Sequence, residues 1–158
     1  MTVIGLTGPT GAGKTTALRV LEDMGFTVVD CDALYYELLK TDEGLRRQLQ
    51  DTFGNVFLPD GRLDRTALGR LVFGDKRALD KLNAIVFPAV TAAVREKISV
   101  CSGRGLVIDA INLIESGLGA LCDCTVAVTA PPEVRIRRIM ERDGISEDYA
   151  RSRVAAQK

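Results

Sequence analysis

The stretch VIGLTGPTGAGKTT, residues 3–16, decides the fold. Its first four residues are apolar and partly β-branched, which predicts a short strand. Residues 8–15 satisfy the pattern GxxxxGK[ST], and from Lys14 onward apolar residues recur at helical spacing. Strand, glycine-rich loop and helix in this order are the context in which the pattern marks a phosphate-binding P-loop. A second apolar run at residues 26–29 completes a βαβ unit, the opening of a parallel sheet.

Composition excludes several classes of protein. The chain has 158 residues, with 21 Lys and Arg balancing 21 Asp and Glu, and 46% hydrophobic residues. This is the composition of one globular domain, not of a disordered chain or a strongly basic nucleic-acid binder. The absence of His removes Ser-His-Asp and Cys-His catalysis and His-ligated metals, so acid or base chemistry falls to Asp, Glu, Lys, Tyr or Cys.

The predicted location is the cytoplasm. The four Cys form no CxxC pair, which favours free thiols in a reduced compartment over a metal site. No apolar run is long enough to span a membrane, and the N-terminus begins with a strand in place of a signal peptide. We therefore expect small-molecule partners, without nucleic acid or membrane.

Helical periodicity replaces the strand pattern in the middle of the chain. Asp64 is placed to cap one helix, and residues 75–98 predict a longer one containing Pro88. Apolar runs at residues 106–108 and 125–128 then predict two more strands, both covered on two faces. A helix over 133–142 and another opening at Ser146 follow. The predicted organisation is one domain over 1–158, with a core of 1–32 and 104–132, a helical subdomain of about 33–100 and a lid of about 133–158.

The P-loop residues predict the chemistry of a nucleotide triphosphate site. Glycines allow backbone N–H groups to converge on phosphate oxygens, and the helix dipole that follows favours the same negative charge. Lys14 is expected at the β- and γ-phosphates, the Thr15 hydroxyl on Mg²⁺, and Thr16 at the α-phosphate. The expected nucleotide-binding residues are Gly8, Gly11, Ala12, Gly13, Lys14, Thr15 and Thr16.

Three acids follow predicted strands. If the strand at residues 26–29 persists, Asp30 and Asp32 point to the same side, and one of them could accept a hydroxyl proton from the phosphoryl acceptor. The alternative is a helix N-cap followed by a solvated acid. Asp109 ends the third strand, where an acid can help to hold Mg²⁺ or merely cap the strand end.

Arginines gather after the last predicted strand. Arg135, Arg138 and Arg142 fall on one helical face, which suits a lid closing over the transferring phosphoryl group. The alternative is a solvated face whose arginines pair with neighbouring acids.

Taken together, the motifs resemble those of the dephospho-coenzyme A kinases over essentially the whole chain. The P-loop segment LTGPTGAGKTT is shared by many kinases, whereas the later motifs are specific to this family. Those motifs are VVDCDA, DGRLDRTALGRLVF, LNAIVFP, VIDAINLIESGL and RIRRIMERDGIS.

The resemblance implies a P-loop NTPase-type α/β/α fold of three layers around a parallel sheet, with a helical acceptor-binding insertion and a helical lid. It implies transfer of the ATP γ-phosphoryl to the ribose 3′-hydroxyl of dephospho-CoA, with ATP and Mg²⁺ as cofactors. By resemblance Asp32 is the catalytic base, Asp30 a supporting acid, and Arg65 part of the acceptor site. Arg138 and Arg142 belong to the lid, with Arg138 and Lys14 in catalysis and Arg142 at the nucleotide, while Asp109 contacts substrate or metal.

The chain departs from the family pattern at three places: Tyr36 stands for a common arginine, Phe87 for a common histidine, and Ile111-Asn112 for a common Pro-Leu pair. Family members continue into a further strand and helix, so we expect this chain to be truncated. The alternatives are a nucleoside monophosphate kinase and a nucleotide-dependent switch; the lack of an NKxD motif argues against a GTPase.

Overall fold

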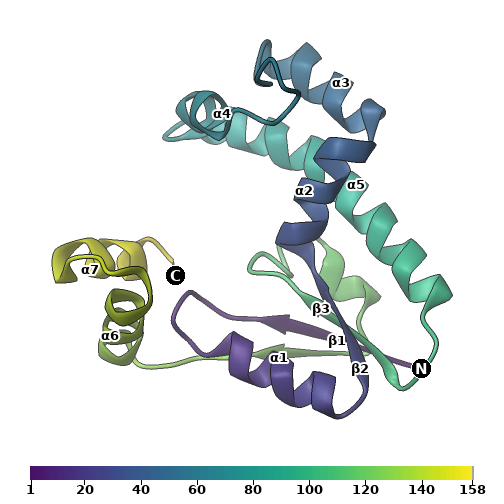
Figure 1. Ribbon diagram of the computed structural model, residues 1–158, viewed down its shortest axis with the longest axis vertical. Coiled ribbons are helices and arrows are strands. Elements are labelled where there is room, and N and C mark those ends of the chain that lie inside the picture. The colour runs from purple at the N-terminus through teal and green to yellow at the C-terminus, as the bar shows by residue number, and fades with distance from the viewer. Residues whose placement is uncertain (158) are drawn as a thin grey trace. The chain divides into compact units, whose positions relative to one another are not determined.

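A computed structural model describes residues 1–157, and Figure 1 traces their order from the N-terminal strand to the C-terminal helices. The chain divides into two compact units. One comprises Met1–Val29 together with the chain from Cys101 onward, and the other comprises Asp30–Val100. The first contains the sheet strands and the P-loop, and the second contains the long middle helices.

A four-stranded sheet forms the centre of the first unit. Its strands are β1 (Thr2–Thr7), β2 (Phe26–Asp30), β3 (Gly105–Asp109) and β4 (Cys124–Ala127), in the spatial order β2-β3-β1-β4. β1 pairs in parallel with both β3 and β4, and Leu6 lies opposite Asp109 in the β1–β3 register. The sequence therefore predicted the parallel sheet correctly, and the α/β class is confirmed.

The two later strands differ in burial. Leu106, Val107 and Ile108 of β3 are at most 1% exposed, as their continuous apolar run predicts. All four residues of β4 are exposed, so the expectation that this strand is covered on two faces is wrong. The reason is position, because β3 lies inside the sheet and β4 lies at its edge.

The helices of the first unit are α1 (Lys14–Asp23), the short 3₁₀ helix η1 (Leu118–Leu121), α6 (Pro132–Asp143) and α7 (Glu147–Ala156). α6 and α7 form a hairpin around a small apolar core that includes Ile136, Ile139 and Ala150. Ser146 accepts a hydrogen bond from the Tyr149 N–H and so begins α7, as predicted. The 3₁₀ helix was not predicted.

The second unit is mainly helical, with α2 (Cys31–Thr41), α3 (Glu43–Phe53), α4 (Arg65–Val72) and α5 (Lys76–Val100), and one antiparallel bridge pairs Phe57 with Leu63. Asp64 caps α4 through the Ala67 N–H, as the sequence predicts, and α5 runs through Pro88. Leu39, Leu45 and Leu49 lie in the core that α2 and α3 share with the rest of the unit. Across residues 1–157, no helix is both long enough and apolar enough to cross a membrane.

Candidate nucleotide-binding site

The N-terminus of α1 is open. Its N-cap residue is Gly13, which has φ 106° and makes no side-chain capping bond, and the first turn carries no acid. The first amides of an α-helix have no carbonyl partner one turn earlier, so the N–H groups of Lys14 and Thr15 are available to an external anion, whereas the Thr16 N–H donates to the Gly13 carbonyl at 3.1 Å. Glycine is required at Gly13 because other residues rarely adopt this left-handed conformation. The sequence and the local backbone thus leave this helix end without a side-chain cap.

The loop before α1 is held tightly against the end of the sheet. A Cβ atom at Gly8, which has φ 152°, would lie 2.3 Å from the Val128 carbonyl oxygen, so no side chain fits there. Ala12 is buried and donates its N–H to the Pro9 carbonyl at 3.1 Å. The phosphate-binding loop therefore has a defined shape before any ligand arrives.

Lys14 and Asp109 form an ion pair at this end of the sheet. Lys14 Nζ donates to Asp109 Oδ1 at 2.6 Å, and the two side chains are only 18% and 14% exposed. β2 and β4 lie on opposite sides of the β1–β3 pair, so the strand order reverses there. Ligands of open α/β sheets bind at such a reversal, beyond the carboxyl ends of the strands. Both residues were predicted to belong to the site, but their pairing was not.

Two arginines of α6 contact the P-loop. Arg138 Nη1 donates to the Gly11 and Ala12 carbonyls, each at 3.1 Å. Arg135 Nε donates to the Thr10 carbonyl at 3.0 Å and is 7% exposed. The hairpin thus brings positive charge directly to the loop.

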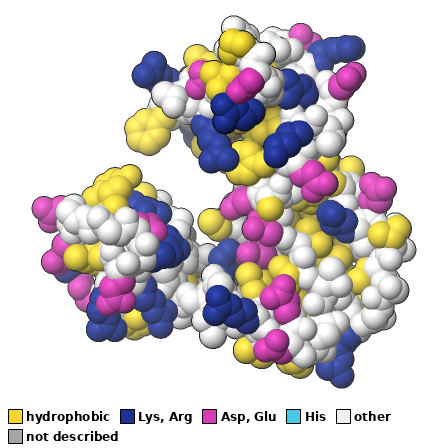
Figure 2. All heavy atoms as spheres, in the orientation of Figure 1, with side chains coloured by type: hydrophobic (Ala, Val, Ile, Leu, Met, Phe, Trp, Pro, Cys, Tyr) yellow, Lys and Arg dark blue, Asp and Glu magenta, His cyan; other side chains and the backbone are white. Residues whose placement is uncertain are grey.

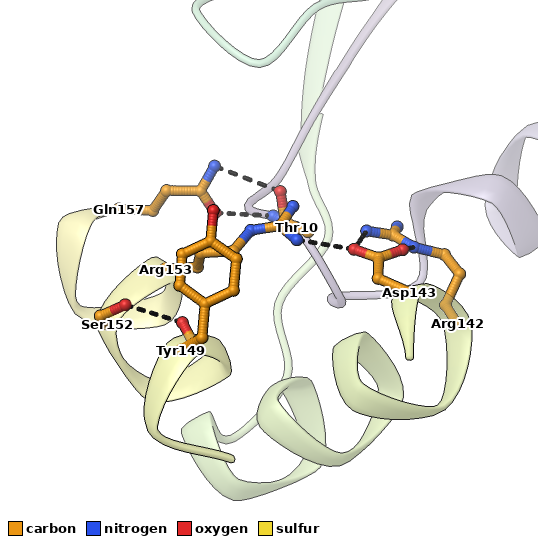
Figure 3. A network of polar contacts seen from close by, with 7 residues as sticks. All are labelled: Thr10, Arg142, Asp143, Tyr149, Ser152, Arg153 and Gln157. Atoms are coloured by element: carbon orange, nitrogen blue, oxygen red, sulfur yellow. Dashed lines mark hydrogen bonds and ion pairs between the residues drawn. The ribbon is translucent and has the colours of Figure 1, made fainter. Parts of the chain in front are cut away.

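Arg142 behaves differently from the other two arginines. It forms a two-pronged contact with Asp143, which also binds Arg153 of α7 (Figure 3). These guanidinium groups, Arg142 first, hold the pKa of Asp143 well below its usual range. In the view of Figure 2, basic and acidic side chains are interspersed over the hairpin. For Arg142, the structure therefore agrees with the second alternative of the sequence analysis, a solvated arginine that pairs with a neighbouring acid.

The second unit contains the other predicted acids, and of the two alternatives for Asp30 and Asp32 the structure has the helix N-cap. β2 ends at Asp30 and α2 begins at Cys31, so Asp30 and Asp32 are not two residues of one strand. Asp30 Oδ1 accepts the N–H groups of Asp32 and Ala33, at 2.9 and 3.0 Å. Asp30 is therefore the N-cap of α2, and the local hydrogen bonds end the strand there. Asp32 lies in the exposed first turn.

Arg65 lies at the start of α4, and its guanidinium carbon lies 4.0 Å from the centre of the Tyr36 ring. This cation–π contact involves one of the three departures from the family pattern. Burial raises the pKa of the neighbouring Tyr35 to about 12. The exposed Arg65 guanidinium thus packs on the aromatic ring of Tyr36, which belongs to the same unit.

The predicted metal ligands are Thr15 and Asp109. Thr15 and Thr16 are exposed in the first turn of α1, beside Lys14. Within residues 1–157, no group of three or more Cys, Asp or Glu side chains is placed to hold a metal ion. Hydroxyl and carboxylate oxygens are nevertheless the donors that Mg²⁺ prefers, and this ion normally retains several waters when it binds beside phosphate. The two side chains fit that donor chemistry.

Sequence reasoning missed the contact between Thr10 and the end of α7. Gln157, directly after α7, directs its side-chain amide to Thr10 in Figure 3, and Gln157 Oε1 accepts the Thr10 N–H at 2.9 Å. The two residues are 147 positions apart. No local pattern marks such a pair, since a single glutamine near a helix end has many other uses.

Comparison with known proteins gives one consistent result. The family model of dephospho-CoA kinase matches residues 2–158. A dephospho-CoA kinase of Anaeromyxobacter dehalogenans is 42% identical over 161 residues, which cover 99% of this chain and 76% of the relative. That of Carboxydothermus hydrogenoformans is 36% identical over 159 residues, or 98% of this chain and 77% of the relative. The chain thus spans about three quarters of the length of these relatives.

Two solved structures have a similar fold. A crystal structure of a Thermus thermophilus protein matches with a TM-score of 0.82 at 36% identity, covering 99% of this chain and 80% of that one. A shikimate kinase from Bacteroides thetaiotaomicron has a TM-score of 0.57 at 14% identity, covering 99% of this chain and 77% of its own. The second likeness concerns the fold alone.

Proposed function

The chain belongs to the dephospho-CoA kinase family, and we propose that it transfers the γ-phosphoryl group of ATP to the ribose 3′-hydroxyl of dephospho-CoA. The family match over nearly the whole chain carries this conclusion. The open N-terminus of α1 supports it, because the amides there, with Lys14 beside them, suit a triphosphate.

In the proposed nucleotide complex, Lys14 exchanges one of its contacts. Its ammonium group, now on Asp109, would move onto the β- and γ-phosphate oxygens, which carry more negative charge than one carboxylate. The backbone of Gly8, Gly11, Ala12 and Gly13 shapes the loop around the phosphates, and the Thr16 hydroxyl is free to reach the α-phosphate. The carboxylate of Asp109 then becomes available for another cation.

Mg²⁺ is the cation that suits those freed oxygens. Thr15 and Asp109 would hold it, the carboxylate directly or through water, and the bound ion would supply charge neutralisation at the transferring phosphoryl group. Arg138, whose guanidinium already reaches the loop carbonyls, is proposed to stabilise the same developing charge. Arg142 would have to leave Asp143 before it could join Arg138 at the nucleotide.

Asp32 is the proposed base. Its carboxylate would take the proton of the 3′-hydroxyl while the hydroxyl oxygen bonds to the γ-phosphorus and ADP leaves with the electron pair of the broken bond. Asp32 is an exposed residue in the first turn of α2, and the carboxylate of Asp30 caps the same helix by accepting two amides. Asp30, as a supporting acid, and Arg65 are proposed to orient the acceptor.

The test is a coupled assay of ADP release with ATP and dephospho-CoA. Asp32→Asn should lower kcat by about 10²–10⁴-fold, the range of a general base, while ATP affinity stays within about twofold of the parent chain. Asp51→Asn, an acid on the α3 surface, is the matched control and should change neither value. Full turnover in Asp32→Asn would remove this residue as the base. A parent chain that phosphorylates a nucleoside monophosphate better than dephospho-CoA would overturn the function itself.

We also propose that the protein works in the reduced cytoplasm. Cys101, Cys122 and Cys124 are free thiols in the structure, and burial raises the pKa of Cys122 and so favours its neutral form.

A further inference from the structure

Thr10 of the P-loop is held by the α6–α7 hairpin at every polar group it has. Its N–H donates to Gln157 Oε1 at 2.9 Å, its carbonyl accepts from Arg135 Nε at 3.0 Å, and its hydroxyl accepts from Gln157 Nε2 at 3.2 Å. Arg135 Nη2 also donates to Gln157 Oε1, at 3.3 Å. Arg135, Gln157 and Thr10 thus form a closed triangle, which we call the Thr10 brace.

The brace is built around an unusual charge. Among residues 1–157, Arg135 is the one charged residue that is buried, and no ion pair joins it to a carboxylate in that part of the chain. Its partners, a peptide carbonyl and a side-chain amide, are both neutral. Burying a charge without a counter-ion costs free energy. The buried charge lies next to the P-loop, because Arg135 donates to the Thr10 carbonyl.

Gln157 gives the Arg135 guanidinium a neutral hydrogen-bond partner. A glutamate at the same place could accept the same two hydrogen bonds and would neutralise the guanidinium, whereas the amide satisfies Arg135 without adding negative charge. The amide also donates to the Thr10 hydroxyl, which fixes its orientation. Because Gln157 occupies the Thr10 N–H and the Pro9 carbonyl occupies the Ala12 N–H, the amides left for phosphate are those of Gly11 and of the residues that begin α1.

We propose that Arg135 and Gln157 are positioning residues for the nucleotide triphosphate. They fix the Thr10 peptide so that the amides after it face the phosphates, and the uncompensated charge of Arg135 favours the negative charge bound there. They act through the P-loop and leave the acceptor untouched. This inference rests on the proposed function only in taking ATP as the ligand of the loop.

Two variants test the proposal, read out by ATP titration and by the KM values for both substrates. Gln157→Glu should weaken ATP binding on the order of tenfold, because a carboxylate now neutralises Arg135 beside the triphosphate. Its thermal stability should equal or exceed that of the parent, since the new ion pair is partly buried. Arg135→Gln should weaken ATP binding by a similar factor, and the KM for dephospho-CoA should change less than twofold in both.

The controls carry the same chemical changes elsewhere. Gln48→Glu on exposed α3 and Arg137→Gln on the exposed side of α6 should leave ATP binding within twofold. ATP affinity within twofold of the parent in both test variants would overturn the proposal, as would equal losses for both substrates together with a lower Tm. If Arg135→Gln fails to fold, Gln157→Glu alone decides the outcome. A parent chain that binds ATP but does not phosphorylate dephospho-CoA contradicts the proposed function and leaves this test intact.

Discussion

The N-termini of α1 and α2 are built from the same elements and finished in opposite ways. Each helix follows a strand of the sheet directly or after one loop. α2 receives the carboxylate of Asp30 on two of its first amides, whereas α1 has glycine at the same position and no capping side chain. A cap stabilises a helix by about 1 kcal/mol, so leaving it out is a measurable loss.

The other helices show how unusual the uncapped end of α1 is. α3, α4 and α7 follow the pattern of α2, each with an Asp or Ser that accepts a backbone N–H. α6 also lacks a side-chain cap, but its first residue is Pro132, which has no N–H to satisfy. Open amides together with nearby Lys and Arg are thus found at α1, the arrangement that the proposed triphosphate site requires.

The largest effect should come from placing aspartate, the residue type that caps α2, at the N-cap position of α1. Gly13→Asp adds both a Cβ at φ 106° and a carboxylate at the phosphate site, so ATP binding should fall at least about a hundredfold by titration. Gly13→Ala adds the Cβ without the charge and separates strain from repulsion. Equal ATP affinity in Gly13→Asp and the parent would mean that this helix end does not receive phosphate.

A smaller effect is expected when the α2 cap is opened. Asp30→Ala removes the acceptor of two hydrogen bonds and should lower the free energy of unfolding by about 1 kcal/mol, measured by urea denaturation. Asp30→Asn is the matched control, because asparagine caps as well as aspartate and should restore most of that loss.

Activity then separates the two roles of Asp30. If it is also a supporting acid for the acceptor, Asp30→Asn should raise the KM for dephospho-CoA despite its restored stability. A KM equal to that of the parent in Asp30→Asn would leave Asp30 as a cap alone.

Sequence reasoning succeeded where the cause is local. Asp64 and Ser146 were predicted as caps because a cap acts on amides two or three residues away, and the P-loop was recognised because its glycines, Lys14 and the following helix are contiguous. The strand positions were predicted for the same reason, since an apolar run reports on its own burial. β4 was misjudged because whether a strand lies at the edge depends on the rest of the sheet.

The site was only partly predictable because its contacts join distant segments. Helical periodicity placed Arg135, Arg138 and Arg142 on one face, yet only the first two contact the P-loop, while Arg142 is taken by the adjacent Asp143. The pairing of Lys14 with Asp109 follows from the β1–β3 register, which the linear sequence does not contain. Residue types could be predicted from the sequence, but not which residues contact one another.

The smallest expected effect concerns the far end of α6, where charged side chains join α6 to α7. Asp143 bridges Arg142 and Arg153, and these contacts lower its pKa in the folded chain. A carboxylate with a lowered folded pKa stabilises the fold above its unfolded pKa, near 4, and loses that contribution as pH falls toward the folded value. Asp143→Asn should therefore lower Tm slightly at pH 7, and the difference from the parent should shrink steadily below about pH 4. Because the cluster is on the surface, 1 M salt should also shrink the Tm difference. A Tm difference that does not shrink between pH 4 and pH 2.5 would indicate that Asp143 acts through hydrogen-bond geometry and not through charge.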